Sequence, residues 1–112
     1  MAIVANLIID QGSDFTSTIT VEDTVGNLLD LTNYTIQGQV RKTYTSSTSY
    51  AFTCTKLTSQ GPGKLRIELS PTQTGSMKPG RYVYDVEIVH VSGTPVIRVV
   101  EGQVTVTPRV TR

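Results

Sequence analysis

The chain has 112 residues, a length that allows one domain with its own hydrophobic core and leaves no room for a second. Its net charge is +1, and its ten Lys and Arg residues are scattered, so the sequence offers no basic stripe for nucleic acid. The single cysteine, Cys54, excludes an intrachain disulfide and a cysteine-based metal cluster. We therefore expect one domain, over residues 1–112, that is stabilised by its hydrophobic core alone.

The first segment, MAIVANLIID, is apolar and predicts a β-strand. It has no preceding basic segment and no small-residue cleavage pattern, so we do not interpret it as a signal peptide. It is also too short to span a membrane. We therefore expect a soluble chain with no membrane association, made in a reducing cytoplasm.

Further along the chain, apolar residues alternate with polar ones, and no segment keeps a helical period beyond about one turn. This pattern predicts about seven strands separated by turns, which is typical of a sandwich or small barrel. The strands before the final pair are expected at Ala2–Ile9, Asp14–Glu22, Leu28–Leu31, Tyr34–Lys42, Tyr50–Lys56 and Lys64–Leu69.

Three polar segments predict turns. Asp23–Gly26 has an acid at its first position and glycine at its fourth, the pattern of a type I turn. Ser46–Ser49 is a polar loop tip, and Ser59–Gly63 contains two glycines suited to positive φ.

One helical turn is predicted between Leu69 and Gly80. Ser70 suits the N-cap, Pro71 suits the first helical position, and Gln73 completes a capping box. Tyr82 then stands near the start of a long strand, where a tyrosine corner lies in immunoglobulin-like sandwiches.

The last third predicts two long strands, Gly80–Val91 and Thr94–Thr107. Tyr82, Tyr84, Val86 and Ile88 share one face of the first strand, opposite Arg81, Asp85 and Glu87, as in a half-buried antiparallel strand. The expected core contains the inward positions of several strands, namely Ile19, Val21, Ile36, Val40, Phe52, Leu65, Ile67, Tyr84, Val86 and Ile88.

A two-residue loop at Ser92-Gly93 would join these strands. That register places Ile88 opposite Ile97, Val86 opposite Val99 and Glu87 opposite Arg98. Val104 and Val106 then have the wrong parity for the core, so we expect a β-bulge between Val99 and Gly102, with Gly102 as the bulge residue.

The residues with chemical potential favour ordinary structural roles. Asp85 and Glu87 share a strand face, as two carboxylates of a glycosidase would, but we interpret them as a solvated face paired with Arg98. His90 is the only histidine and has no metal-binding companion. Cys54 is expected to be a small buried hydrophobe.

Three further patterns carry little functional weight. Gly61-Pro62-Gly63 lacks the spacing of a phosphate loop, and Asn33-Tyr34-Thr35 matches the glycosylation triplet that arises often by chance. Tyr44 and Tyr50 flank a polar loop and are the better candidates for surface contacts or for stacking on sugars. We assign no catalytic, cofactor-binding or metal-ligating residue.

Most of the chain resembles a family of small virion proteins of tailed bacteriophages and prophages, with a layout similar to the amino-terminal domain of phage baseplate upper proteins. The matching parts are structural motifs, namely Asp30-Leu31-Thr32, the Ser70-Pro71 crossover, the run Pro79 to Asp85, the run Glu101 to Val106 and the ending Val110-Thr111-Arg112. The resemblance implies an all-β, immunoglobulin-like antiparallel β-sandwich of about seven strands with one short helical turn.

The resemblance also implies a function. It predicts a non-enzymatic structural protein of the virion, in a tail, baseplate, neck or capsid position, that binds other phage structural proteins or copies of itself. It predicts a possible homo-oligomer, no cofactor, and neither nucleic acid nor membrane as a partner. The alternative is a carbohydrate-binding or adhesion module of the same fold, because a fold alone does not fix function.

Overall fold

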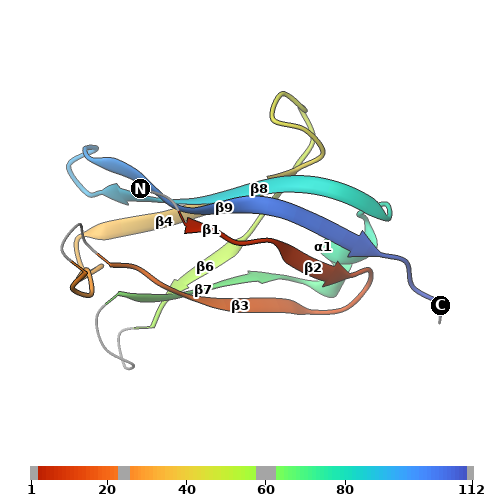
Figure 1. Cartoon of the computed structure of the whole chain (residues 1–112), viewed down its shortest axis with the longest axis horizontal. Helices are drawn as coiled ribbons and strands as arrows, with labels where there is room; N and C mark the ends of the chain where they lie inside the picture. The colour runs from red at the N-terminus through yellow and green to blue at the C-terminus, as the bar shows by residue number, and fades with distance from the viewer. Residues whose placement is uncertain (1–2, 23–25, 58–62, 111–112) are drawn as a thin grey trace.

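The computed structural model describes residues 3–22, 26–57 and 63–110. These residues form two β-sheets packed face to face, with one short helix at one end (Figure 1). This confirms the expected all-β class and the two-sheet arrangement. The described elements are β1 (Ile3–Val4), β2 (Leu7–Asp10), β3 (Phe15–Thr20), β4 (Tyr34–Arg41), β5 (Ser49–Ala51), β6 (Thr53–Lys56), β7 (Lys64–Leu69), α1 (Pro71–Gly75), β8 (Gly80–His90) and β9 (Val96–Thr107).

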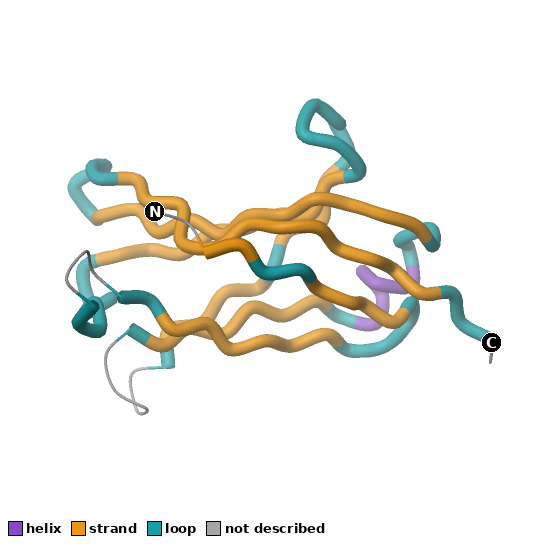
Figure 2. The backbone as a smooth tube through the Cα atoms, viewed as in Figure 1, coloured by secondary structure: helices purple, strands orange, loops and turns teal. Residues whose placement is uncertain are grey.

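The larger sheet has the strand order β1-β9-β8-β4-β5, with β2 also paired to β9, and the smaller sheet has the order β3-β7-β6. Figure 2 shows the two layers as separate sets of strands. The pairing is antiparallel except where β1 and β2 run parallel to β9. The expectation of a wholly antiparallel sandwich is therefore wrong, because the first and last strands are neighbours and run in the same direction.

Three expected strands differ in the structure. Ala2–Ile9 is divided into β1 and β2. Leu28–Leu31 forms only an isolated bridge, from Leu28 to Glu22, and no strand. The reason lies in Asp30, whose carboxylate accepts hydrogen bonds from the Thr32 N–H and hydroxyl at 3.0 and 2.5 Å. A side chain that captures a main-chain N–H two residues on turns the backbone out of an extended path.

The expected strand Tyr50–Lys56 divides between the two sheets at Phe52. Its first part, β5, pairs with β4, and its second part, β6, pairs with β7. The ring of Phe52 lies between the sheets, with its centroid 6.1 Å from that of Tyr84. Gly38 makes room for it, since a Cβ there would lie 3.0 Å from the Phe52 ring and 2.9 Å from the Asp85 carbonyl oxygen.

Helix α1 begins as its sequence predicts. Ser70 is the N-cap and accepts a hydrogen bond from the Gln73 N–H, while the Gln73 side chain accepts one from the Ser70 N–H, which completes the capping box. After the helix, the Tyr82 hydroxyl donates a 2.8 Å hydrogen bond to the Lys78 carbonyl, four residues upstream. Both features confirm the structures predicted from the sequence.

The β8–β9 register confirms two of the three expected pairs, Ile88 with Ile97 and Glu87 with Arg98. Val86 pairs with Val100 and not with Val99, because Val99 is itself the extra residue of a β-bulge. The bulge is thus confirmed, but Gly102 is not its special residue. Its effect is to bury both Val99 and Val100, which an unbroken strand would point to opposite faces.

The two-residue loop at Ser92-Gly93 is wrong. The Gly93 N–H donates to the His90 carbonyl at 2.8 Å, so the turn is centred on Val91-Ser92, and Gly93 follows it with φ of 96°. Strand β9 begins only at Val96, since Pro95 has no N–H to donate to the ladder. The connection between β8 and β9 therefore has five residues.

The core lies between the sheets and contains eight of the ten expected residues. Ile19 and Ile36 are only partly buried and pack against it. The other buried apolar residues include Tyr82, Val99, Val104 and Val106, which the strand alternation and the expected bulge also place inward, and Ile9, Leu31, Leu69, Met77 and Val100, which were not expected there. Of the expected turns, Asp23–Gly26 and Ser59–Gly63 fall mostly outside the described residues, although Gly26 and Gly63 both have positive φ. The described Ser46–Ser49 segment forms the predicted loop tip.

Candidate functional site

The first candidate site is the edge of the larger sheet formed by β1 and β2, here called the amino-terminal edge (Ile3 to Asp10). Within the described residues, β9 is the strand that pairs with this segment, and its other side has no strand beside it. The edge is visible along the front of Figure 1. An unpaired strand edge presents main-chain N–H and C=O groups that can pair with another chain.

The amino-terminal edge is attached to the core at its centre. The chain leaves regular strand geometry at Ala5 and Asn6, where the Ala5 carbonyl accepts a hydrogen bond from the hydroxyl of the buried Tyr84. The Asn6 side chain then accepts a 3.0 Å hydrogen bond from the Gln103 N–H. A Cβ at residue 102 would lie 2.2 Å from the Ala5 oxygen, so the attachment requires Gly102.

Three large apolar side chains are exposed along this edge. Ile3 is 61%, Val4 73% and Ile8 70% exposed, while Ile9 of the same strand is fully buried. Apolar groups gathered on an unpaired edge are typical of a contact surface, whereas single exposed apolar residues are ordinary. These three side chains distinguish this edge from the edges formed by β3, β5 and β6.

Two of the other sheet edges, β5 and β6, carry features that discourage pairing. β5 has three residues, β6 ends at the exposed Lys56, and β3 presents the exposed hydroxyls of Thr16 and Thr18. Short strands and charged side chains are common protections of sheet edges. The amino-terminal edge has neither Lys nor Pro and contains no charged residue from Ile3 to Ile9. β3 likewise has no Lys, Pro or charged residue, but its exposed side chains are Thr16 and Thr18, whereas the amino-terminal edge exposes large apolar ones.

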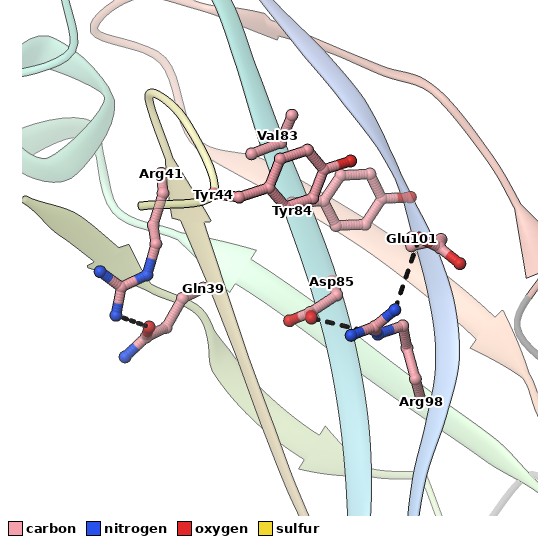
Figure 3. Close-up of a pocket in the computed structure, with 8 residues that line it drawn as sticks. All are labelled: Gln39, Arg41, Tyr44, Val83, Tyr84, Asp85, Arg98 and Glu101. Carbon is pink, nitrogen blue, oxygen red and sulfur yellow. Dashed lines mark hydrogen bonds and ion pairs between the residues drawn. The ribbon is translucent and has the colours of Figure 1, made fainter. Parts of the chain in front are cut away.

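The second candidate site is a hollow of about 230 Å³ on the outer face of the larger sheet. Its polar lining comes from neighbouring strands: Arg41 on β4, Asp85 on β8, and Arg98 and Glu101 on β9 (Figure 3). The loop between β4 and β5 adds Tyr44, whose side chain is 80% exposed. Alternation on these strands places the polar residues on one face, away from the core.

Charge in the hollow is balanced by short contacts. Arg98 pairs with Asp85 at 3.3 Å and with Glu101 at 3.7 Å. Arg41 donates to the Gln39 side chain at 2.8 Å and also to the Ser46 carbonyl. These contacts hold both guanidinium groups beside oxygen acceptors. A polar ligand in the hollow would bind to the same guanidinium and acceptor groups.

Asp85 has a perturbed acidity. Burial raises the pKa of its carboxyl above the usual value, and the nearby charge of Glu87 raises that pKa further, while Arg98 lowers it. The Glu87 carboxylate accepts a 3.2 Å hydrogen bond from Gln37. The expected Glu87–Arg98 ion pair is thus wrong, although the two residues are cross-strand neighbours, because Arg98 reaches Asp85 and Glu101 instead.

The remaining candidate residues have structural contacts. His90 bonds to the Ser92 hydroxyl at 2.9 Å and stacks edge-on against Tyr34. Tyr50 is not a free surface residue, because it packs against the core and lies edge-on to Tyr82. Cys54 is partly buried, and burial raises the pKa of its thiol, which fits the predicted role of a small hydrophobe.

Sequence reasoning missed two features of these sites. Gln39, Arg41 and Glu101 were not identified, although the alternation that places Asp85 on the outer face also places them there. The attachment of Ala5 to Tyr84 has no local sequence signal. Within the described residues, no group of three or more His, Cys, Asp or Glu could hold a metal ion, and no helix is long and apolar enough to cross a membrane.

No protein-family model and no curated protein sequence matches this chain. Among solved structures, part of InlP from Listeria monocytogenes superposes with a TM-score of 0.48 and 15% identity, over 95% of this chain and 28% of that chain. Part of a family 123 glycoside hydrolase from Clostridium perfringens superposes with a TM-score of 0.44 and 13% identity, over 97% and 23%. The chain thus spans about a quarter of the length of these proteins.

Proposed function

We propose that this chain is an immunoglobulin-like, non-catalytic building block of a tailed-phage particle, and that it acts through contacts with other virion proteins or with copies of itself. The strand order supports the finer fold assignment, since one sheet carries β9, β8 and β4 and the other carries β3, β7 and β6, as the two sheets of an immunoglobulin sandwich do. The bond from Tyr82 to the Lys78 carbonyl supports it further as a tyrosine corner.

The observation that carries the proposed function is the amino-terminal edge. It combines an unpaired side with exposed apolar groups at Ile3, Val4 and Ile8. A partner strand added there would satisfy main-chain groups and remove these side chains from water. The low net charge of +1 does little to keep neighbouring proteins apart, as a closely packed particle requires.

The virion setting comes from the resemblance and is tested separately from the edge. Particles produced by the source organism or its prophages are purified on a density gradient, and their proteins are identified by mass spectrometry. The proposal predicts peptides of this chain in intact particles, at a fixed ratio to the tail or baseplate proteins. Intact particles that lack the chain would contradict it, as would neighbouring genes for polysaccharide use instead of portal, terminase or tail proteins.

A carbohydrate-binding or adhesion module is the second candidate, and the hollow beside Tyr44 favours it. An exposed tyrosine ring next to Asp85, Arg98 and Gln39 offers one stacking surface together with several hydrogen-bonding groups. Glycan-array binding followed by calorimetry tests this function. A carbohydrate-binding function predicts glycan binding that Tyr44→Ala abolishes. The control is Val91→Ala, at an exposed apolar site on the β8–β9 loop, which should leave binding unchanged.

A further inference from the structure

We propose that the amino-terminal edge pairs with the same edge of a second copy of the chain, antiparallel and about a twofold axis at Asn6. This inference deepens the proposed function and rests on it, since it names the partner and register of one contact. The Ala5 and Gln11 N–H groups donate to β9, at the carbonyls of Glu101 (2.9 Å) and Thr107 (3.1 Å).

Main-chain groups alternate in direction along a strand, so in β1 the residue before Ala5, and in β2 every second residue counted back from Asp10, point the opposite way from these donors. Val4 and Ile8 therefore direct their N–H and C=O groups away from β9, toward the unpaired side. The Asp10 N–H also points there, but the Asp10 carbonyl accepts a hydrogen bond from the Ser13 N–H at 3.1 Å. Val4 pairs with Glu101 and Ile8 pairs with Thr105 on β9. Glu101 and Thr105 lie on the outer face of the sheet, so the side chains of Val4 and Ile8 lie on that face as well. Both thus present an apolar side chain on one face and free main-chain groups at the edge.

The segment is symmetric in its pattern about Asn6. Val4 and Ile8 lie two residues to either side of it and share the outer face, while Ile3 and Ile9 lie three residues to either side and share the inner face. In an antiparallel pair centred on Asn6, Val4 of one copy faces Ile8 of the other. A twofold interface requires this self-complementarity, because each contact between two different residues occurs twice, once from each copy.

The pairing also fits in charge and in geometry. No charged residue lies between Ile3 and Ile9, so no like charges meet at the centre of the interface. Residues whose main-chain groups face each other in an antiparallel ladder form a hydrogen-bonded pair, here Val4 with Ile8. The result is one continuous sheet through both copies. So short a strand pair buries less than a standard interface of about 1,600 Å², and we expect a weak, concentration-dependent dimer.

Sedimentation velocity over a range of concentrations tests the dimer with the full chain. Ile8→Lys places two ammonium groups in the twofold interface, and we expect it to raise the dimer dissociation constant by at least about tenfold. Thr18→Lys is the matched control, since it adds the same charge to an exposed position on β3, the edge of the other sheet. We expect this control to dimerise as the original chain does.

Disulfide trapping tests the register. Val4→Cys and Ile8→Cys are prepared separately in a Cys54→Ala background, so that each chain has one thiol. The hydrogen-bonded pair places the two Cα atoms about 5.5 Å apart, within disulfide reach. We therefore expect a mixture of the two variants to give the mixed disulfide dimer, and either variant alone to stay uncrosslinked, since identical positions lie about 13 Å apart along the strands.

Three results would overturn the inference: a strictly monomeric chain at high concentration, a dimer that Ile8→Lys leaves intact, or trapping of each single variant with itself in preference to the mixture. None of them would by itself remove the proposed function. A monomer found in purified particles would still be a virion protein with a different partner on this edge, whereas absence from particles with an intact dimer would remove the virion setting alone.

Discussion

The hydroxyl of Tyr84 donates a hydrogen bond to the main-chain carbonyl of Ala5, 79 residues away in the sequence. Tyr84 is 5% exposed and belongs to the core, whereas Ala5 lies at the centre of the amino-terminal edge. This contact explains why the first expected strand, Ala2–Ile9, is broken into β1 and β2. The break turns one carbonyl inward and leaves the residues on both sides of it in register with β9.

Tyr84→Phe removes this bond and leaves the Ala5 carbonyl without its donor. We expect the free energy of unfolding to fall by about 1–3 kcal/mol, the usual cost of an unsatisfied buried polar group. Chemical denaturation gives the value, and hydrogen exchange shows where it acts. Tyr82→Phe is the control, since it removes the bond to Lys78 and leaves the edge intact. Faster exchange in β1 and β2 in the control, with no change in Tyr84→Phe, would contradict this assignment.

Gly102→Ala tests the close approach of the first and last strands. The added methyl group would lie 2.2 Å from the Ala5 oxygen, so the amino-terminal edge must shift away from β9. Overpacking of this kind typically costs about 1–3 kcal/mol, and here we expect the cost together with loss of protection in β1 and β2. Gly26→Ala, whose added methyl would touch nothing, controls for the glycine change itself, although its positive φ of 90° adds a local cost. A stable Gly102→Ala variant with unchanged β1 and β2 would contradict the contact.

The core assignment predicts large losses at two fully buried positions. Ile67 on β7 and Ile88 on β8 belong to different sheets, and each is 0% exposed. We expect either change to Ala to lower the free energy of unfolding by about 2–5 kcal/mol. Val91→Ala is the control, since Val91 is 68% exposed on the β8–β9 loop and a surface change should stay within about 0.5 kcal/mol. Near-neutral effects at both core positions in urea denaturation would overturn the packing described.

Asp85 and Asp30 predict opposite dependences of stability on pH. The folded-state pKa of Asp85 is raised, first by burial, so its charge costs stability above that pKa, and the cost disappears as the pH falls toward the unfolded value. The pKa of Asp30 is lowered, first by the Thr32 side chain, so its charge stabilises the fold at neutral pH and that gain is lost as the pH falls through the lowered folded-state pKa.

We therefore expect Asp85→Asn to melt at the same or a higher temperature than the original chain at neutral pH, and Asp30→Asn to melt lower. Both differences should vanish in acid, where the original carboxyls are protonated. Thermal melts from neutral to acidic pH measure them, and the shared titration of the other carboxylates cancels in the comparison. A neutral-pH loss for Asp85→Asn and a gain for Asp30→Asn would reverse both signs and contradict the described contacts.

Local patterns in the sequence predicted much of the fold. The alternation in β8 placed Tyr82 and Tyr84 in the core, and the capping box placed α1, because both signals depend on residues close together in the chain. The parity conflict between Val99 and Val104 likewise revealed the bulge. The position of the β8–β9 turn was missed by one residue, since Gly93 suits both a primed turn and the positive-φ position after another turn.

Features that depend on distant contacts were not predictable. Alternation continues without interruption through Phe52, so the sequence gives no sign that the strand changes sheets there. Gly102 suggested a bulge, but its role is to admit the carbonyl of Ala5, a residue almost the whole chain away. The amino-terminal edge could be predicted as a strand, yet its pairing with β9 and its exposed side depend on the whole topology.

The central claim is that the chain works through its amino-terminal edge, and concentration-dependent hydrogen exchange tests it most directly. The main-chain N–H groups of Val4, Ile8 and Asp10 point away from β9, so exchange at these sites reports on a partner strand. We expect slower exchange at these three amides when the chain associates with its partner, and unchanged exchange at the edges formed by β3, β5 and β6. Slower exchange at one of those edges, with the amides of Val4, Ile8 and Asp10 unchanged, would contradict the account.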